Sequence, residues 1–266
     1  MKISVFLDHL TAMAQAEGIT VAEALTFAKR LGIDYVEADA NAFFGHEAKW
    51  QSMFADSGLK VGGMYCFFDF AHADQTEQAD AFLALGVKMG ADSLMALPGF
   101  LAEGDDPDVI LNRMADALNT LSVKAASMGL SLVLEDFDAS NAVFGDLKGL
   151  KWILSQVPRL GCVFDTGNFI YHGDDIRAAY DALCGRIRHV HLKDRALTKQ
   201  YGSEELRCVT GQLLYPAPVG SGCLPMETIV KLLRSDGYDG IWAIEHFGAA
   251  DMRACISESV RWLKSI

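Results

Sequence analysis

The sequence has 266 residues, of which 51% are apolar, and a formal net charge of −12 at neutral pH. This length suits two small domains or one α/β barrel, and the apolar fraction is large enough to fill a sizeable core. The negative charge leaves no basic stripe of the kind that neutralises nucleic-acid phosphates, so we expect no nucleic-acid partner.

Nothing in the sequence indicates a membrane protein. No stretch approaches the roughly 20 apolar residues that cross a bilayer, and the apolar run before Asp8 is too short for a signal peptide. The six cysteines are scattered without a CxxC pair, a pattern typical of reduced thiols. We therefore expect a cytoplasmic protein without a membrane partner.

Short β-rich runs alternate with longer amphipathic stretches from end to end. The predicted strands are ISVFL (3–7), YVEAD (35–39), VGGMYC (61–66), SLMAL (93–97), SLVLED (131–136), GCVFD (161–165), RHVHL (188–192) and IWAIE (241–245). The predicted helices lie at or near 20–32, 46–57, 73–90, 106–129, 147–156, 174–184, 225–236 and 251–264.

Eight strands, each followed by a helix, predict an α/β fold of the (β/α)8 TIM barrel type, with a single domain over 1–266. An open doubly wound sheet is the competing architecture. Such a sheet usually carries a glycine-rich phosphate-binding fingerprint after its first strand, whereas this chain reads FLDHLTAMA there. No linker or change in composition divides the chain, and its longest predicted irregular segment is 195–224.

The seventh predicted strand lies in the segment RHVHLKD, which has an unusual polar pattern. Side chains at alternate positions of an extended chain share one face. We therefore expect His189, His191 and Lys193 to line one side of this segment, while Val190 and Leu192 pack on the other. One face is predicted to be apolar and the other to carry chemistry.

Acidic or imidazole side chains lie at the ends of four consecutive predicted strands: Glu135, Asp165, His191 and Glu245. In TIM barrels the active site lies at this end of the strands. Three carboxylates close together need a counter-charge, which a divalent cation supplies. Mixed carboxylate and imidazole ligands suit Mn²⁺, Mg²⁺, Co²⁺ or Zn²⁺. For any one of these residues, a salt bridge at the barrel rim is the alternative interpretation.

Five segments of the second half carry a family resemblance: LVLEDF, VFDTGNF, HVHLKD, PVGSGCLPMETIVKLLRSDGYDG and IWAIEHF. Together they resemble the signature segments of the sugar phosphate isomerase/epimerase superfamily, whose members are xylose-isomerase-like TIM barrels. The resemblance covers 131–247 and is only architectural before that. It implies that Glu135, Asp165, His191 and Glu245 hold one divalent metal ion, and that Glu135 and Glu245 also move protons as the catalytic pair.

The substrate pocket is predicted from the resemblance and from the strand ends of the first half. Asn168 matches a position where ketose epimerases carry a substrate-binding histidine. The predicted substrate-binding residues are Asn168, His189, Lys193, His9, Glu37, Phe67 and Phe68, with Phe100 as a further pocket candidate. Core positions for Phe67 and Phe68, and an ion pair for Glu37, are the alternatives.

The end of the irregular segment offers a second type of ligand site. Gly220, Ser221 and Gly222 precede the helix that begins near Pro225, so their backbone N–H groups could receive an anion such as a substrate phosphate. A plain turn leading into the helix is the alternative that we favour. Asp194 is expected either to support a ligand residue or to cap a helix.

The resemblance implies a metal-dependent sugar or sugar phosphate isomerase/epimerase that transfers a proton through a metal-bound enediolate. An inosose-type dehydratase on the same metal site is the main alternative. A non-catalytic sugar-binding barrel and an endonuclease IV-like hydrolase are less favoured. The hydrolase lacks support because Asn168 stands where those enzymes have a histidine. The expected partner is a small-molecule carbohydrate, and a homo-oligomer is left open.

Overall fold

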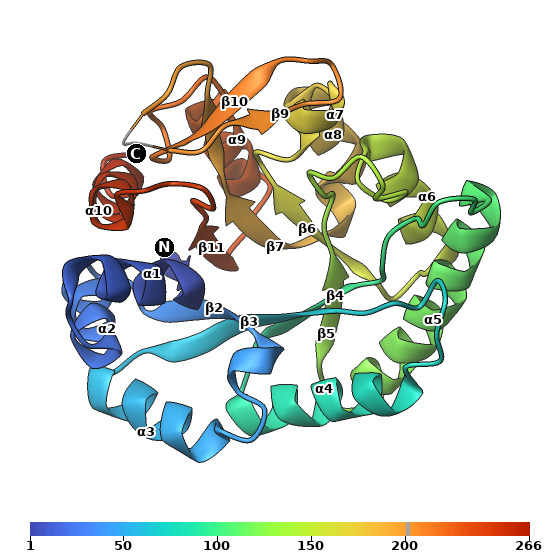
Figure 1. The fold of residues 1–266 in the computed structure, drawn as a ribbon, viewed down its shortest axis with the longest axis horizontal. Helices are drawn as coiled ribbons and strands as arrows, with labels where there is room; N and C mark the ends of the chain where they lie inside the picture. The colour runs from blue at the N-terminus through green and yellow to red at the C-terminus, as the bar shows by residue number, and fades with distance from the viewer. Residues whose placement is uncertain (201–202) are drawn as a thin grey trace.

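The computed structural model describes residues 1–200 and 203–266. Eight parallel strands form a closed barrel in the order β1-β11-β7-β6-β5-β4-β3-β2, and helices surround it (Figure 1). The single-domain TIM barrel predicted from the sequence is therefore confirmed. The barrel strands are β1 (Lys2–Phe6), β2 (Tyr35–Asp39), β3 (Lys60–Phe67), β4 (Ser93–Leu97), β5 (Ser131–Leu134), β6 (Gly161–Asp165), β7 (Ile187–Leu192) and β11 (Ile241–Ile244).

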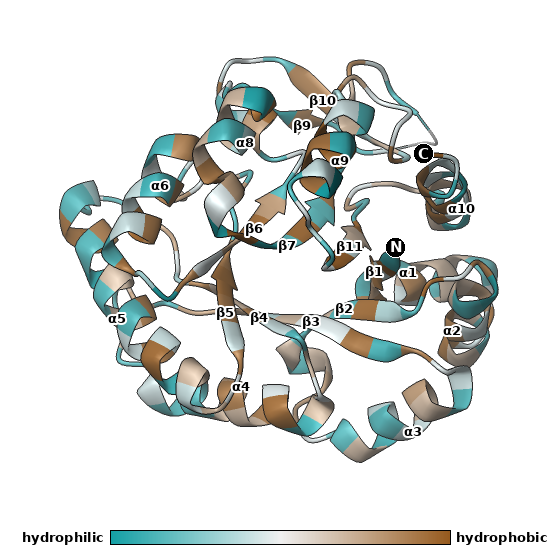
Figure 2. Ribbon diagram, turned by 180° about the vertical axis from the view of Figure 1, so that it is seen from behind, coloured by the Kyte–Doolittle hydropathy of each residue, from teal (hydrophilic) through white to brown (hydrophobic). Residues whose placement is uncertain are grey.

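The helices bury one face against the barrel and expose the other. Figure 2 shows this as alternating brown and teal segments along the helices. They are α1 (Leu7–Glu17), α2 (Val21–Arg30), α3 (Glu47–Ser57), α4 (Thr76–Met89), α5 (Pro107–Ser127), α6 (Leu147–Gln156), α7 (Phe169–His172), α8 (Ile176–Leu183), α9 (Met226–Ser235) and α10 (Met252–Leu263), with short 3₁₀ turns η1 (Ala40–Ala42) and η2 (Cys184–Arg186). Among the described residues, no helix combines the length and apolarity that crossing a membrane requires.

Local sequence signals explain where several helices begin. At α2, the side chain of Thr20 accepts a hydrogen bond from the backbone N–H of Glu23, whose own side chain accepts one from the N–H of Thr20. This reciprocal capping box satisfies two backbone donors that the helix start would otherwise leave free. At α5, Asp106 caps the backbone N–H groups of the first turn, and Pro107 occupies a position that needs no donor.

Three parts of the chain differ from the prediction, one of them the four-residue helix α7, which was not predicted. Helix α1 was not predicted, because it follows β1 directly and no side chain caps its start. The segment 195–224 was predicted to be irregular, but it includes most of a small antiparallel sheet in the order β8-β10-β9. Its strands are β8 (Asp194–Ala196), β9 (Leu206–Arg207) and β10 (Leu213–Ala217).

The carboxylate of Asp194 holds the loop between β10 and α9 against the end of β7. It accepts hydrogen bonds from the backbone N–H groups of Gly220 and Gly222 at 2.9 Å each and of Leu224 at 3.4 Å. Burial raises the pKa of Asp194 to about 6, while these N–H donors favour its charged form. The anion that this turn receives is therefore a side chain of the protein itself.

Replacing Gly222 with alanine is expected to lower stability by about 1–3 kcal/mol, the usual cost of overpacking. A Cβ atom there would collide with the Asp194 carboxylate and the Arg195 carbonyl. Chemical denaturation measures the change. The matched control is Gly185→Ala, where a Cβ would meet no atom within 4 Å. Equal stability of the two variants would contradict the tight fit of the loop around Asp194.

Candidate metal centre

Four buried side chains converge at the carboxyl ends of neighbouring barrel strands. Glu135 follows β5, Asp165 ends β6, His191 lies on β7, and Glu245 follows β11. Each side chain has one potential ligand atom, and these four atoms all lie within 4.8 Å of one another. His191 Nδ1 is 2.9 Å from Glu135 Oε2 and 3.4 Å from Glu245 Oε2. The structure thus brings together the four residues predicted as metal ligands.

Strand pairing produces this convergence. In the parallel register, Asp165 of β6 lies beside His191 of β7, and Ala243 of β11 lies beside the same histidine. The backbone N–H of Glu245 donates to the carbonyl of Leu192 at 3.1 Å, which extends the ladder by one step. The side chains of these strands that point into the barrel therefore lie at the same height along the barrel axis.

The chemistry of the donor set fits a divalent cation. Asp165 Oδ1 accepts hydrogen bonds from the backbone N–H groups of Gly167 and Asn168, at 2.7 and 3.1 Å. Asp165 Oδ2 is buried without a hydrogen-bond partner. Burial raises the pKa of Asp165 to about 8, because it outweighs the attraction of Lys193 and His191 for the charged form. Three carboxylates and one imidazole match the oxygen and nitrogen ligands of Mg²⁺, Mn²⁺, Co²⁺ or Zn²⁺.

The two glutamates of this group differ in electrostatic surroundings. Burial raises the pKa of Glu135 above its usual range. Burial also opposes the charge of Glu245, but Lys193 and His191 outweigh that effect and hold its pKa well below its usual range. The pKa of His191 is raised well above its usual range, because its interactions with both glutamates outweigh burial.

Lys193 provides a positive charge beside the four residues. Its Nζ lies 2.5 Å from Glu245 Oε1, 3.4 Å from Asp165 Oδ2 and 3.7 Å from Asp138 Oδ2, and it donates to Asn168 Oδ1 at 2.7 Å. Burial disfavours the ammonium, but the three carboxylates raise its pKa above the usual range. Lys193 is therefore a buried cation whose charge is neutralised by the neighbouring carboxylates.

A cavity of about 290 Å³ opens above the cluster. Aromatic and other apolar side chains form most of its wall, and charged groups lie at its floor and on one side. Its lining residues are Phe6, Asp39, Tyr65, Phe67, Met95, Leu97, Glu135, Phe137, Asp138, Lys193, Glu245 and Phe247. A small apolar-walled cavity with a few convergent polar groups is the usual form of a ligand site.

Some predicted pocket residues lie where the sequence suggested. Phe67 and Lys193 line the cavity, as do Glu135 and Glu245 of the predicted catalytic pair. The side chain of Phe67 is 41% exposed, which leaves it free to contact a ligand. Their roles in binding and catalysis stay predictions.

Phe68, His9 and Asn168 do not line the cavity, and their roles in substrate binding stay predictions. Phe68 stacks on Phe70, with ring centroids 4.6 Å apart, in the core outside the barrel. His9 Nε2 accepts the backbone N–H of His246 at 2.7 Å, and burial lowers its pKa to about 3. Asn168 is fully buried, since its amide donates to the Asp136 carbonyl and its oxygen receives Lys193.

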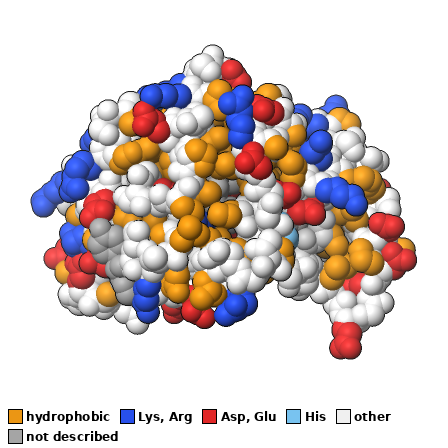
Figure 3. Space-filling view, turned by 90° about the horizontal axis from the view of Figure 1, so that it is seen from above, with side chains coloured by type: hydrophobic (Ala, Val, Ile, Leu, Met, Phe, Trp, Pro, Cys, Tyr) orange, Lys and Arg blue, Asp and Glu red, His pale blue; other side chains and the backbone are white. Residues whose placement is uncertain are grey.

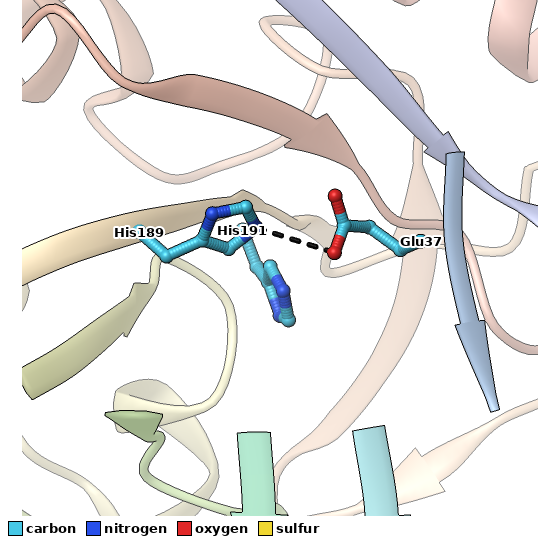
Figure 4. A group of neighbouring side chains, drawn as sticks. All are labelled: Glu37, His189 and His191. Atoms are coloured by element: carbon cyan, nitrogen blue, oxygen red, sulfur yellow. Dashed lines mark ion pairs between the residues drawn. The ribbon is translucent and has the colours of Figure 1, made fainter. Parts of the chain in front are cut away.

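Glu37 and His189 are buried in the barrel interior and do not line the cavity, and their roles in substrate binding stay predictions. Figure 4 shows the two side chains pointing toward each other, with His191 beside them. Glu37 Oε2 is 3.4 Å from His189 Nε2, and Ser93 Oγ is 3.4 Å from His189 Nδ1. Glu37 therefore forms the ion pair that the sequence analysis kept as an alternative. Phe100 packs behind the wall against Phe67 and Phe137.

Sequence reasoning missed several residues of the wall. Asp39 ends β2, Phe137 and Asp138 follow Glu135, and Phe247 follows Glu245 by two residues. Position just after a barrel strand was a usable signal for all of them, since the loops there build the active-site face. On the face of the molecule shown in Figure 3, side chains of both charges are interspersed with hydrophobic ones, without a continuous basic patch.

Comparison with known proteins gives a family match over most of the chain. The sequence model of the xylose isomerase-like TIM barrel family matches residues 25–266. Among curated relatives, inosose dehydratase from Clostridium beijerinckii is 29% identical over 136 residues, or 50% of this chain and 45% of the relative. The chain spans about half the length of the curated relatives that it matches.

Solved structures of similar fold cover the whole barrel. D-allulose 3-epimerase from Methylomonas sp. has a TM-score of 0.76 and 15% identity, covering 100% of this chain and 97% of that one. A xylose isomerase-like TIM barrel protein from Mycobacterium smegmatis, in complex with magnesium, has a TM-score of 0.74 and 17% identity over 99% and 95%. The IOLI protein, solved with a zinc atom, has a TM-score of 0.75 and 16% identity over 100% and 96%. The closed barrel and the match over residues 25–266 together show that this chain belongs to the xylose isomerase-like TIM barrel family.

Proposed function

We propose that this chain is a divalent-metal-dependent isomerase or epimerase that moves a proton next to the carbonyl group of a carbohydrate. One observation carries the proposal: four ligand atoms of Glu135, Asp165, His191 and Glu245 converge at the floor of a cavity that two of these residues line. Solved proteins of the same fold hold magnesium in one case and zinc in another, which supports a metal without choosing it.

The proposed mechanism assigns separate tasks to the four residues. All four would hold the metal, and when bound it supplies Lewis-acid stabilisation of negative charge on the carbonyl oxygen. Glu135 and Glu245 come from β5 and β11, which β6 and β7 separate in the barrel. They therefore approach a substrate from two sides, so one can remove a proton as base while the other returns one as acid. Asp165 and His191 lie between them and fix their spacing.

The surrounding side chains would prepare the site for this proton transfer. The aromatic wall that includes Phe6, Phe137 and Phe247 excludes water from the floor. Lower polarity strengthens the interactions of the glutamates with a developing charge. Lys193 holds one oxygen of Glu245 at 2.5 Å, which orients that carboxylate.

A dehydratase is the second candidate, favoured by the relative named inosose dehydratase. Dehydration begins with the same proton removal next to a carbonyl and then expels a hydroxyl group as water. The same two glutamates would serve both reactions. Mass analysis of the product separates them, because a dehydratase product is lighter by one water and an isomerase product keeps its mass.

Incubation of the metal-loaded protein in D₂O with ketoses, ketose phosphates and inososes is expected to place deuterium on a carbon next to the carbonyl. Glu135→Gln and Glu245→Gln should each lower this exchange about 10²–10⁴-fold, the usual contribution of a general acid or base. NMR and mass spectrometry measure the exchange. Glu227→Gln, on the exposed Glu227–Lys231 pair of α9, is the matched control. Full activity in both active-site variants would refute the assignment.

Loss of one carboxylate ligand is expected to weaken metal binding. Loss of a residue that only hydrogen-bonds to a metal ligand weakens metal binding by roughly 10–100-fold. Asp165→Asn removes a ligand itself, so it should raise the dissociation constant of the metal by more than that. Calorimetric titration with Mg²⁺, Mn²⁺, Co²⁺ and Zn²⁺ measures it and also ranks the four ions. Asp92→Asn, an exposed residue before β4, provides the same chemical change away from the site. Unchanged affinity in Asp165→Asn would exclude this cluster as the metal centre.

A further inference from the structure

The positive charge at the cavity is already neutralised by carboxylates of the protein. Lys193 is the one cationic side chain among the cavity-lining residues in the described part of the chain. Its ammonium is surrounded by Glu245, Asp165, Asp138 and the Asn168 amide oxygen. No donor of comparable charge is left to receive a phosphate or carboxylate of a ligand.

Arg195, the next cationic residue in the chain, is neutralised by Asp138, which also lies beside Lys193. Arg195 is buried, its Nη2 lies 2.5 Å from Asp138 Oδ2, and its Nε donates to the Gly167 carbonyl at 3.3 Å. The Oδ2 atom of Asp138 thus faces both Lys193 and Arg195. The Asp138 side chain is 23% exposed and lines the cavity, so it stands where a ligand anion would otherwise meet these two cations.

The backbone site that suited a phosphate is also occupied. The N–H groups of Gly220 and Gly222 both donate to Asp194 Oδ2 at 2.9 Å. Turns of this kind bind phosphates in many enzymes because their N–H groups point at one place. Here the same groups hold an internal carboxylate.

The total charge also disfavours an anionic ligand. The carboxylates of Asp39, Glu135, Asp138 and Glu245 line the cavity, and with the buried Asp165 they outnumber the cations Lys193 and Arg195. A phosphate or carboxylate group of a ligand in this small cavity would be repelled by them.

The rest of the wall suits an uncharged ring. The rings of Phe6, Tyr65, Phe67, Phe137 and Phe247 line the cavity, and Phe67 and Phe137 meet edge to face with centroids 6.0 Å apart. Such walls bury the C–H faces of a ligand, while its hydroxyl groups meet the polar floor. A volume of about 290 Å³ lies at the lower limit of small-molecule sites and fits a single ring.

We propose that the site takes uncharged polyhydroxylated ketones, that it excludes phosphorylated and carboxylated ones, and that Asp138 determines this selectivity. The inference rests on the proposed function and names the substrate class of that site. Glu245 and Asp165 neutralise Lys193, and Asp138 neutralises Arg195, so Asp138 removes the remaining cation that would bind an anion.

The test compares phosphate binding by three magnesium-loaded proteins: the wild type, Asp138→Asn and Asp181→Asn. Asparagine at 138 keeps the shape of the side chain but removes the charge that neutralises Arg195, while Lys193 keeps Glu245 and Asp165. Inorganic phosphate should therefore bind at least tenfold more tightly than to the wild type. Asp181→Asn makes the same change in the exposed Arg177–Asp181 pair of α8 and should bind as the wild type does. Attraction of phosphate to magnesium is common to all three proteins and cancels. Equal affinity in Asp138→Asn and the wild type overturns the proposal.

A second measurement needs no variant, in case Asp138→Asn is unstable. Calorimetry of the wild type with a ketohexose and with its phosphate ester should show that the ester binds more weakly than the sugar. Equal or tighter binding of the ester overturns the proposal. Neither measurement depends on turnover. Absence of deuterium exchange with every neutral ketone would therefore refute the proposed reaction alone, and strong phosphate-ester binding would refute the selectivity alone.

Discussion

The structure of the site depends on the cost of bringing buried carboxylates together. Glu135, Asp165 and Glu245 lie at one end of a closed barrel, where burial removes most of their contact with solvent. The chain offers His191 and Lys193 as counter-groups, and it leaves Asp165 Oδ2 without a hydrogen-bond partner. Most other features of the site follow from this electrostatic requirement, including the ion pairs that surround Lys193 and the aromatic wall that limits access.

The barrel strands determine how much of this could be predicted from the sequence. Alternation along a strand is a local property, so RHVHLKD alone indicated that His191 and Lys193 share a face. The closed parallel topology then brings the ends of separate strands to one level, so Glu135 and Glu245 could be predicted to meet. The same alternation carries no information on depth: His189 shares the face of His191 but lies two residues earlier on the strand, against Glu37.

Residues in loops could not be placed by such rules. Asp138 and Phe137 lie beyond the end of β5, where no repeating pattern relates sequence position to direction. Phe67 and Phe68 are adjacent in sequence, yet one lines the cavity and the other packs on Phe70 outside the barrel. The start of α1 was missed for a related reason, since it has neither a capping side chain nor a preceding turn.

Asp194 links two regions that are separate in the chain. Its backbone belongs to β8, directly after the strand that bears His191, and its side chain binds the turn that leads into α9. The outer helix and the reactive end of β7 are therefore mechanically joined through one carboxylate. A segment exchanged into this turn must therefore supply backbone N–H donors to the Asp194 carboxylate, in place of those of Gly220 and Gly222.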